Sequence, residues 1–408
     1  MRALQERFGG PARAFRADYL TFDPDGRFTA PDLSMAVRFR IGELIAYFFR
    51  SLLWSLNLLL VLYTLLGDWL LYRLPTQHWT ASMIMLSLPI VWVINIGFVI
   101  GWLFARPWRS WLSGLTLLIS LILFGPRTFG WHEPKPTPAN RLAVRVFSYN
   151  VEQFNLTNNR FEREHSSDRV QRMFAYILRF DAPIKCFQEF YNSKRVPGHN
   201  LLDRFRRAGY GNVVMLDSNA AAYGEGGLGT VIFSKFPIIQ SGRDFFWGLN
   251  GIVWADIHTG RDTIRVINVH LHSMGIRVNK VLMQNQLTGV KYQTHGILSA
   301  LRFGFIERQE QVGRVEALIR ASPYPVIVTG DHNETPYSVV YERLRRMLPN
   351  SFENAGRGFG FTYNHPPGFI RIDHQFHDPR LPALNFETLN DVSYSDHYPI
   401  VGTYALRR

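Results

Sequence analysis

Cysteine is nearly absent from this sequence, because Cys186 is the single one among 408 residues. An intramolecular disulfide is therefore excluded, and so is a cluster of thiolate ligands around a metal ion. The neighbouring residues Ile184, Lys185 and Phe187 are typical of a strand, which predicts that the Cys186 thiol is buried.

Three other sequence signals are also missing. No apolar stretch follows the first few residues, so a cleavable secretory signal is not expected. No internal repeat is present along the chain. The glycine-rich stretch at residues 224–229 has no lysine-serine ending, which excludes a P-loop for nucleotide phosphates.

Acidic residues are outnumbered by basic ones. The chain has 45 lysines and arginines against 32 aspartates and glutamates, a formal net charge of +13. Residues 1–138 carry 13 basic and 8 acidic side chains, a net +5, and residues 139–408 carry 32 and 24, a net +8. This excess suits a polyanionic partner or an anionic membrane surface, and it does not choose between them.

Long apolar runs are confined to residues 41–131, which are predicted to be a transmembrane region. Residues 82–104 contain no charged side chain and are long enough to cross a hydrocarbon core of about 30 Å. Residues 52–71 form another predicted span, although they include Asn57 and Asp68. An interior carboxylate costs roughly 2.5–3.5 kcal/mol, which the surrounding leucines can offset.

A third candidate span, residues 111–124, is short enough that a re-entrant or interfacial helix stays open as an alternative. The arginines flank the spans unevenly: Arg38, Arg40 and Arg50 precede the first, Arg106 and Arg109 precede the third, and Arg73 alone lies between the first and second. Because positively charged loops stay in the cytoplasm, residues 1–40 are predicted to be a cytoplasmic tail. With three spans the chain leaves on the opposite face, the periplasm in a bacterium, through a stiff proline-rich tether at residues 132–140.

Residues 141–408 alternate between predicted strands and helices, which is typical of an α/β domain. Apolar runs predict seven strands, at residues 142–151, 183–190, 229–236, 263–271, 326–330, 370–376 and 398–406. Amphipathic helices are predicted at residues 168–180 and 307–321, where apolar residues fall on one stripe. Residues 274–306 match neither pattern. They are expected to be an inserted loop or helix near the functional site that is described below.

Short polar clusters end these apolar runs. In chain order they are Ser148-Tyr149-Asn150, Gln188-Glu189, Asn268-Val269-His270, Gly330-Asp331-His332-Asn333, Arg371-Ile372-Asp373 and Ser395-Asp396-His397. A strand normally ends in turn residues, so repeated endings in carboxylate, carboxamide or imidazole predict one convergent site for metal-assisted phosphoester cleavage. Taken singly, Asn150 or Asp373 is more often a turn former, and His270 is open to interpretation as a core histidine.

In this order and spacing the clusters resemble those of the endonuclease/exonuclease/phosphatase superfamily, over residues 141–406. That superfamily includes pancreatic-type deoxyribonucleases, abasic-site endonucleases, inositol-polyphosphate phosphatases and neutral sphingomyelinases. The resemblance implies a four-layer α/β sandwich, two packed mixed β-sheets flanked by helices, preceded here by an N-terminal α-helical transmembrane region. It also implies a metal-dependent phosphoric ester hydrolase, similar to bacterial proteins with short N-terminal membrane helices.

The resemblance further implies a metal site. Glu189 matches the principal metal-binding carboxylate of the family, with Asn150 and Asp396 expected nearby. A hard cation such as Mg²⁺ takes oxygen ligands of this kind, and Mn²⁺ is the alternative.

The catalytic roles are implied by the same resemblance. Asp331 matches the residue that orients or deprotonates the attacking water, and Asn333 matches the carboxamide that positions the phosphate. His397 matches the imidazole that contacts the scissile phosphate, and Asp373 matches the carboxylate that holds its tautomer and charge. His270 matches a histidine of the deoxyribonuclease branch that acts as general acid or phosphate donor.

Two positions depart from the family pattern, because His332 and His374 stand where the family usually has aromatic residues. Both substitutions leave the catalytic groups in place, but they allow an altered pocket wall or an added metal ligand. The substrate therefore stays open, and a nucleic acid, a phospholipid and a sugar phosphate are the alternatives. The lipid bilayer is an expected partner, and no obligate protein partner is expected. The alternative class is a non-catalytic membrane protein whose sandwich binds a phosphorylated ligand.

Overall fold

The structure, a computed structural model, describes residues 21–22, 28–29, 33–74, 76–139, 141–155, 166–196, 198–217, 227–260, 262–273, 287–366 and 368–406. The chain divides into two compact units, Met1–Leu62 and Tyr63–Arg408. In the first unit, β1 (Thr21–Phe22) and β2 (Phe28–Thr29) form an antiparallel ribbon. Helix α1 (Leu33–Arg73) begins in the first unit and ends in the second.

Among the residues that the structure describes, three helical segments are long and apolar enough to cross a membrane. They are Glu43–Arg73 of α1, all of α2 (Trp79–Ala105), and Pro107–Thr128, which joins the short helix η2 (Pro107–Arg109) to α3 (Ser110–Thr128). The third segment has 22 residues and extends past residues 111–124 at both ends. At about 1.5 Å per residue it reaches about 33 Å, which is sufficient for a hydrocarbon core of about 30 Å.

Polar side chains of these helices hydrogen-bond to one another within the second unit. Asp68 Oδ2 accepts a hydrogen bond from Ser120 Oγ at 2.5 Å. The amide of Asn95 donates to Thr64 Oγ1 at 2.9 Å, and all four side chains are buried. Because a polar group without a partner is costly in hydrocarbon, these bonds explain how α1 and α2 tolerate polar residues among leucines and isoleucines.

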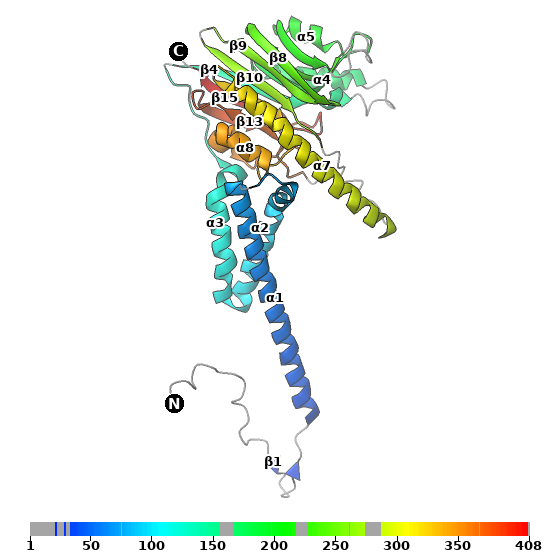
Figure 1. The fold of residues 1–408 in the computed structure, drawn as a ribbon, viewed down its shortest axis with the longest axis vertical. Helices are drawn as coiled ribbons and strands as arrows, with labels where there is room; N and C mark the ends of the chain where they lie inside the picture. Colours follow the sequence, from blue (N-terminus) through cyan, green and yellow to red (C-terminus); the bar gives the residue numbers. More distant parts are fainter. Residues whose placement is uncertain are drawn as a thin grey trace. The chain divides into compact units, whose positions relative to one another are not determined.

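Two mixed β-sheets form the centre of the sandwich domain, residues 141–406, and some of their strands, such as β4, β10 and β15, are labelled in Figure 1. The first sheet has the order β14-β15-β4-β5-β7-β6, and the second has the order β13-β11-β10-β9-β8. The strands of the first sheet are β4 (Leu142–Asn150), β5 (Ile184–Asn192), β6 (Asn212–Asp217), β7 (Gly227–Ser234), β14 (Ala383–Thr388) and β15 (Ile400–Leu406). The strands of the second are β8 (Ile238–Trp247), β9 (Asn250–His258), β10 (Thr263–His270), β11 (Val326–Asp331) and β13 (Asp373–His377). Only β4 with β5 and β10 with β11 are parallel among these pairs.

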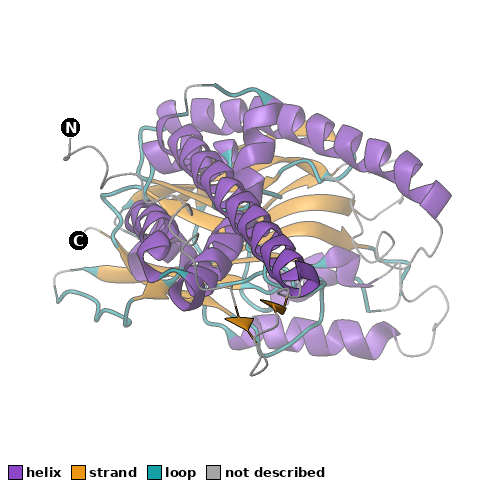
Figure 2. Ribbon diagram, turned by 90° about the horizontal axis from the view of Figure 1, so that it is seen from below, coloured by secondary structure: helices purple, strands orange, loops and turns teal. Residues whose placement is uncertain are grey.

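Helices cover the outer faces of the two sheets, as the helices around the strands in Figure 2 illustrate. Helices α4 (Ser166–Arg179) and α5 (Leu201–Arg207) pack on the first sheet, and α7 (Leu287–Arg320) and α8 (Val339–Met347) pack on the second. Between the sheets lies a core that includes Val146 and Cys186 from one side and Val266 and Ile327 from the other. The predicted four-layer α/β sandwich is confirmed, and so is the burial of Cys186.

All seven predicted strands are present, as β4, β5, β7, β10, β11, β13 and β15, with ends within three residues of the prediction. Strands β6, β8, β9 and β14 were not predicted: polar residues interrupt the apolar runs of β8, β9 and β14, and the apolar run of β6 is only four residues long. In β9, for example, Asp256 is buried, and both its carboxylate oxygens accept hydrogen bonds from Arg265 of β10, at 2.7 and 2.8 Å. Such a cross-strand partner is not visible in a local pattern.

Residues 274–306, which matched no pattern, belong to α7 from Leu287 onward, so that this helix is much longer than the predicted 307–321. Residues 274–286 lie outside the described part of the chain. The described part of the proline-rich tether lies along the sandwich. Strand β3 (Gly130–Trp131) pairs with β12 (Arg357–Gly358), and the backbone N–H of Lys135 donates to Leu384 O at 2.9 Å. The tether is therefore held by the domain that it precedes.

Candidate active site

The predicted site residues meet where the parallel strand pairs of the two sheets end. Asn150 is the last residue of β4, His270 the last of β10 and Asp331 the last of β11. Asp373, the first residue of the antiparallel strand β13, lies opposite Asp331 in the register. The carboxyl ends of parallel strands share one edge of a sheet, which is why residues distant in sequence converge here.

Two site residues have an unusual backbone conformation. Glu189 has a φ of 51° and lies where the pairing of β5 with β7 shifts register between Phe187 and Phe190. Asn333, just after β11, has a φ of 50°. A bulge re-aims a side chain, and left-handed φ values at residues other than glycine are concentrated at functional sites. The local strain therefore points the Glu189 and Asn333 side chains away from the regular strand directions.

Asp331 is the centre of the cluster. Its Oδ2 atom accepts a hydrogen bond from the Asn150 amide at 3.0 Å. The same oxygen lies 3.7 Å from Nε2 of His270 and 3.7 Å from Nε2 of His397. Asp331 is buried, as are both histidines. One carboxylate oxygen is thus shared by a carboxamide and two imidazoles from both sheets.

His397 is oriented by Asp373, whose Oδ2 atom lies 2.8 Å from Nδ1 of the imidazole. Burial lowers the pKa of His397, but the carboxylates of Asp373 and Asp331 outweigh that effect and raise the pKa well above its ordinary value. The raised pKa favours the imidazolium form of His397.

The His397 segment is also fixed to the end of β4, because Ser395 Oγ donates a hydrogen bond to Asn150 O at 2.7 Å.

The predicted metal ligands lie beside this group. The Asn150 amide is 3.5 Å from Glu189 Oε1, which in turn is 3.9 Å from Nε2 of His270. Asp396 directly precedes His397 and accepts a hydrogen bond from Ser395 Oγ at 3.2 Å. The described residues also contain a second possible ligand set, which consists of Asp331, Asp373 and His397. Each residue offers one ligand atom, and these three atoms lie within 4.8 Å of one another.

Glu152 is a carboxylate of this region that the sequence reasoning missed. Burial, followed by the negative charges of Asp396 and Glu189, raises its pKa to about 7. It follows Asn150 by two residues, so its position after a predicted strand end was a usable signal. Several half-buried carboxylates that repel one another fit a divalent cation with oxygen ligands.

The two histidines that depart from the family pattern form part of an aromatic cluster. The imidazole of His332 lies 5.3 Å from that of His374 and 5.6 Å from the Phe376 ring, and Tyr341 lies 4.9 Å from His374. Burial lowers the pKa of His332 to about 4 and that of His374 well below its ordinary value, so both rings are neutral. Both histidines are thus neutral rings of this aromatic cluster. Neither belongs to the possible ligand set of Asp331, Asp373 and His397 found among the described residues.

The remaining predicted residue, Asn333, donates from its amide to Leu271 O at 3.0 Å. Arg308 of α7, which carried no prediction, lies close to this loop and is fully buried. Its guanidinium donates to Glu334 Oε1 at 2.7 Å and to His272 O at 2.9 Å. Arg308 thereby ties the segment after β10 to the segment after β11.

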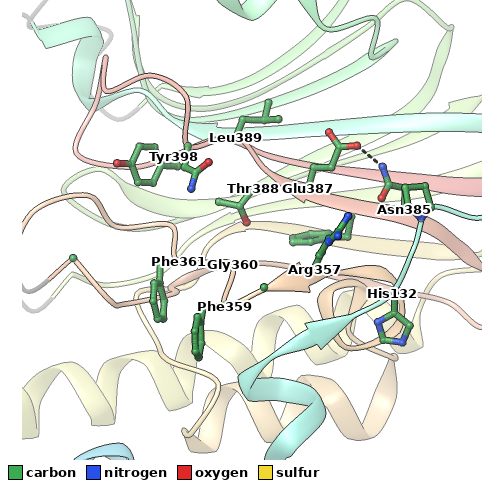
Figure 3. Close-up of a pocket in the computed structure, with 15 residues that line it drawn as sticks. His132, Arg357, Phe359, Gly360, Phe361, Asn385, Glu387, Thr388, Leu389 and Tyr398 are labelled. Atoms are coloured by element: carbon green, nitrogen blue, oxygen red, sulfur yellow. Dashed lines mark hydrogen bonds between the residues drawn. The ribbon is translucent and has the colours of Figure 1, made fainter.

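A separate cavity of about 670 Å³ lies between the tether and β14 (Figure 3). Arg357, Phe359 and Phe361 line it together with Thr388 and Tyr398. Of the described residues that line this cavity, none is a predicted site residue, although Tyr398 directly follows His397. The cavity is therefore adjacent to the cluster around Asp331 and distinct from it.

Comparisons with known proteins support the resemblance seen in the sequence. A family model described as the endonuclease/exonuclease/phosphatase family matches residues 147–397. A second model, a domain of unknown function (DUF8431), matches residues 50–126. No curated protein matches the chain.

Several solved structures match the sandwich domain at low identity. An endonuclease/exonuclease/phosphatase family protein from Bacteroides thetaiotaomicron is 17% identical, with 65% of this chain and 98% of that chain covered and a TM-score of 0.48. A mannosyl-6-phosphatase from Bacteroides thetaiotaomicron VPI-5482 is 18% identical, with 64% and 98% covered and a TM-score of 0.45. TDP2 of D. rerio complexed with single strand DNA product is 16% identical, with 64% and 98% covered and a TM-score of 0.45.

At identities this low, the similarity assigns no substrate to this chain. The family model, in contrast, extends over more than half of the chain and spans every cluster from β4 to His397. The chain therefore belongs to the endonuclease/exonuclease/phosphatase family and is a phosphoric ester hydrolase.

Proposed function

We propose that this protein is a membrane-anchored, divalent-metal-dependent phosphoesterase that cleaves a phosphodiester or phosphomonoester with an activated water. The observation that carries the proposal is the position of Asp331, whose Oδ2 atom lies 3.7 Å from each of two imidazole Nε2 atoms, in His270 and His397. A carboxylate between two imidazoles provides a proton acceptor and two proton donors around one small volume. A protein that only binds a phosphorylated ligand has no need of a proton acceptor there.

In the proposed reaction Asp331 accepts a proton from water, and the water oxygen forms a bond to phosphorus. The bond from phosphorus to the leaving oxygen breaks, and His270 donates a proton from Nε2 to that oxygen. Nδ1 of His270 lies 3.0 Å from Leu249 O, an acceptor, which orients the ring with Nε2 toward the carboxylates.

Two further residues position and stabilise the phosphate. His397, held by Asp373, donates to a phosphoryl oxygen and stabilises the negative charge that develops in the transition state. The amide of Asn333 is the proposed second donor, and its left-handed backbone conformation is the reason its side chain leaves the line of β11.

Glu189, Asn150 and Asp396 are the proposed ligands of Mg²⁺ or Mn²⁺, and the neighbouring carboxylate of Glu152 supports an oxygen-rich site. A bound cation supplies charge neutralisation and polarises a phosphoryl oxygen. Support for the cation comes from the closeness of these half-buried carboxylates, because partial burial of Glu152 together with the charges of Asp396 and Glu189 raises its pKa to about 7.

The proposed anchor is the set of three apolar helices. With three crossings, the arginine distribution favours a cytoplasmic N-terminus and a sandwich domain on the opposite face of the cell membrane, which is the periplasmic face in a bacterium. The proposed domain order is a polar tail at residues 1–40, a transmembrane region at 41–131, a tether at 132–140 and the catalytic domain at 141–408.

The decisive experiment measures hydrolysis of para-nitrophenyl phosphate and bis-para-nitrophenyl phosphate by the purified full chain with Mg²⁺ or Mn²⁺. Asp331→Asn, which keeps the shape of the side chain, should lower kcat by roughly 10²-fold or more. The matched control is Asp203→Asn on α5, at a residue outside the site, and it should be unchanged. No turnover of either ester, or near-normal turnover by Asp331→Asn, would contradict the proposal.

A further inference from the structure

Two walls with exposed apolar side chains border the catalytic groups. The first is the aromatic hairpin, which we define as residues 359–366 and 368–370. Tyr363 in this hairpin pairs with Ile370 and also with His397. The Tyr363 ring lies 5.4 Å from the imidazole of His397, and the hydroxyl of Thr362 accepts a hydrogen bond from the Asp373 N–H at 3.1 Å. The hairpin is therefore bonded to two residues of the site.

The aromatic hairpin is also bonded to the end of α3. The Phe359 ring lies 4.9 Å from the ring of Phe129, the residue that follows α3. Arg371 donates to Phe359 O at 2.7 Å and also donates to Arg127 O in the last turn of α3. One short segment thus connects the end of a predicted membrane span to the imidazole of His397.

The second wall is the apolar stretch of α7, which we define as residues 298–306. Phe303 in this stretch lies 5.3 Å from the imidazole of His272, and Trp247 of β8 lies 6.1 Å from the same ring. His272 follows His270 by two residues, at the end of β10. This wall therefore contacts His272, two residues beyond the other imidazole of the cluster.

The stretch also adjoins the start of α2. The guanidinium of Arg302 lies 5.5 Å from the centre of the Trp79 ring, and the Gln309 amide donates to Ser82 Oγ at 3.3 Å. Helices α2 and α3 are connected by a short turn and pack against each other, so the start of α2 and the end of α3 lie at the same end of this helix pair. Both walls consequently contact the same end of the predicted membrane helices.

The walls expose large apolar side chains. Phe369 of the hairpin is 62% exposed, and Leu298, Phe303 and Ile306 of α7 are 43%, 54% and 46% exposed. Single exposed apolar residues are ordinary, but exposed apolar side chains on two segments that both contact the site region and the same end of the membrane helices are typical of a lipid-contacting surface.

We infer that the site acts at the bilayer surface and takes a phosphoester carried by a lipid, with the two walls in contact with the lipid around it. This inference rests on the proposed function and adds its substrate class. The reaction is the same hydrolysis, in which a water oxygen bonds to phosphorus and the leaving oxygen takes a proton. Aromatic side chains also stack on nucleic-acid bases, so an oligonucleotide is the competing substrate that the test includes.

The test compares two esters with the same scissile bond. Methyl para-nitrophenyl phosphate is soluble, and hexadecyl para-nitrophenyl phosphate inserts into phosphatidylcholine vesicles that hold the full-length protein. The double variant Leu298→Ser with Phe369→Ser removes one exposed apolar side chain from each wall. Ile239→Ser is the matched control, because Ile239 is 55% exposed at the start of β8, far along the chain from both walls.

The wild-type protein should hydrolyse the hexadecyl ester faster than the methyl ester. The double variant should lose about tenfold to a hundredfold on the hexadecyl ester, since each of the two side chains contributes about one order of magnitude when it is fully buried in lipid. Its rate on the methyl ester and its thermal unfolding in detergent should be unchanged, and Ile239→Ser should match the wild type.

Two results would overturn the inference and leave the phosphoesterase proposal intact: equal loss on both esters, or no loss on either. Faster cleavage of a single-stranded oligodeoxynucleotide than of the hexadecyl ester would also reject the lipid substrate. Failure of the wild-type protein to cleave either nitrophenyl ester or the oligonucleotide would instead reject the proposed function itself.

Discussion

The imidazole Nδ1 of His397 and the carboxylate Oδ2 of Asp373 lie 2.8 Å apart, between residues separated by 24 positions in the sequence. This hydrogen bond leaves the Nε2 atom of His397 facing Asp331, whose Oδ2 atom is 3.7 Å away. Asp373 thereby sets which nitrogen of His397 is free to act on a phosphate.

Asp373→Asn should lower kcat by roughly 10²-fold or more with a smaller effect on KM, because an amide keeps the ring in place but does not stabilise its positive charge. The measurement is steady-state hydrolysis of bis-para-nitrophenyl phosphate. Asp391→Asn is the control, since Asp391 accepts a hydrogen bond from Tyr176 outside the site. A normal kcat for Asp373→Asn would remove His397 from the proposed mechanism.

Activity should require an added divalent cation and disappear with chelator, because oxygen ligands dominate the site. Glu189→Gln should raise the Mg²⁺ or Mn²⁺ concentration needed for half-maximal activity by at least roughly tenfold. The same cations should raise the thermal midpoint of the wild-type protein and not that of the variant. Glu387→Gln on β14 serves as the control. Full turnover in excess chelator is the outcome that excludes a metal-dependent reaction.

Stability should depend on pH through Lys185, which is fully buried and donates to Ile177 O at 2.9 Å and to Phe180 O at 2.8 Å. Burial, together with the nearby charge of Lys235 and against the opposing charge of Asp181, lowers its pKa to about 7. In the unfolded chain the pKa is about 10.4, so between these values the unfolded state holds a proton that the native state has lost.

The free energy of unfolding should therefore rise with pH above about 7, by at most about 1.4 kcal/mol per pH unit from this group. Lys185→Met should flatten that rise, which urea unfolding of the full chain in detergent at several pH values will measure. Lys194→Met, at an exposed position, is the control. Identical pH slopes for Lys185→Met and the wild-type protein would mean that Lys185 stays charged in the native state.

Arg127 at the end of α3 should be important for stability, because its guanidinium lies 2.9 Å from Glu342 Oε2 and both side chains are buried. Arg127→Met leaves a buried carboxylate that Arg346 still approaches at 3.2 Å, so a cost of about 3 kcal/mol is expected. The double variant Arg127→Met with Glu342→Met should cost less than the single variant. Unfolding in detergent measures both, and a less stable double variant would contradict this account.

The orientation of the chain is a separate prediction. If all three helical segments span, protease added outside intact spheroplasts should remove the domain from residue 139 onward and leave the N-terminal tail protected. A reporter fused after Arg408 should behave as exported. Protection of the domain until the membrane is broken would mean that Pro107–Thr128 is interfacial, and the lipid substrate would then lie in the inner leaflet.

Local patterns in the sequence were sufficient for the fold class. Periodicities of two and 3.6 residues are properties of neighbouring positions, so the seven strands, the apolar helices and the burial of Cys186 followed from them. The convergence of the strand-end clusters could also be predicted, because the carboxyl ends of parallel strands lie at the same edge of a sheet. The roles of Glu189, Asp331 and His397 remain predictions until the variants are measured.

What the tertiary structure decided was the set of contacts between distant residues. The pairing of Asp256 with Arg265 made β9 a buried strand, and the left-handed backbone at Glu189 depends on pairing of β5 with β7. The contact of Phe359 with Phe129 joins positions 230 residues apart in numbering, 359 less 129, and so has no trace in any local pattern. A sequence specifies local propensity directly, whereas such contacts arise only when the packed sheets and helices bring their ends together.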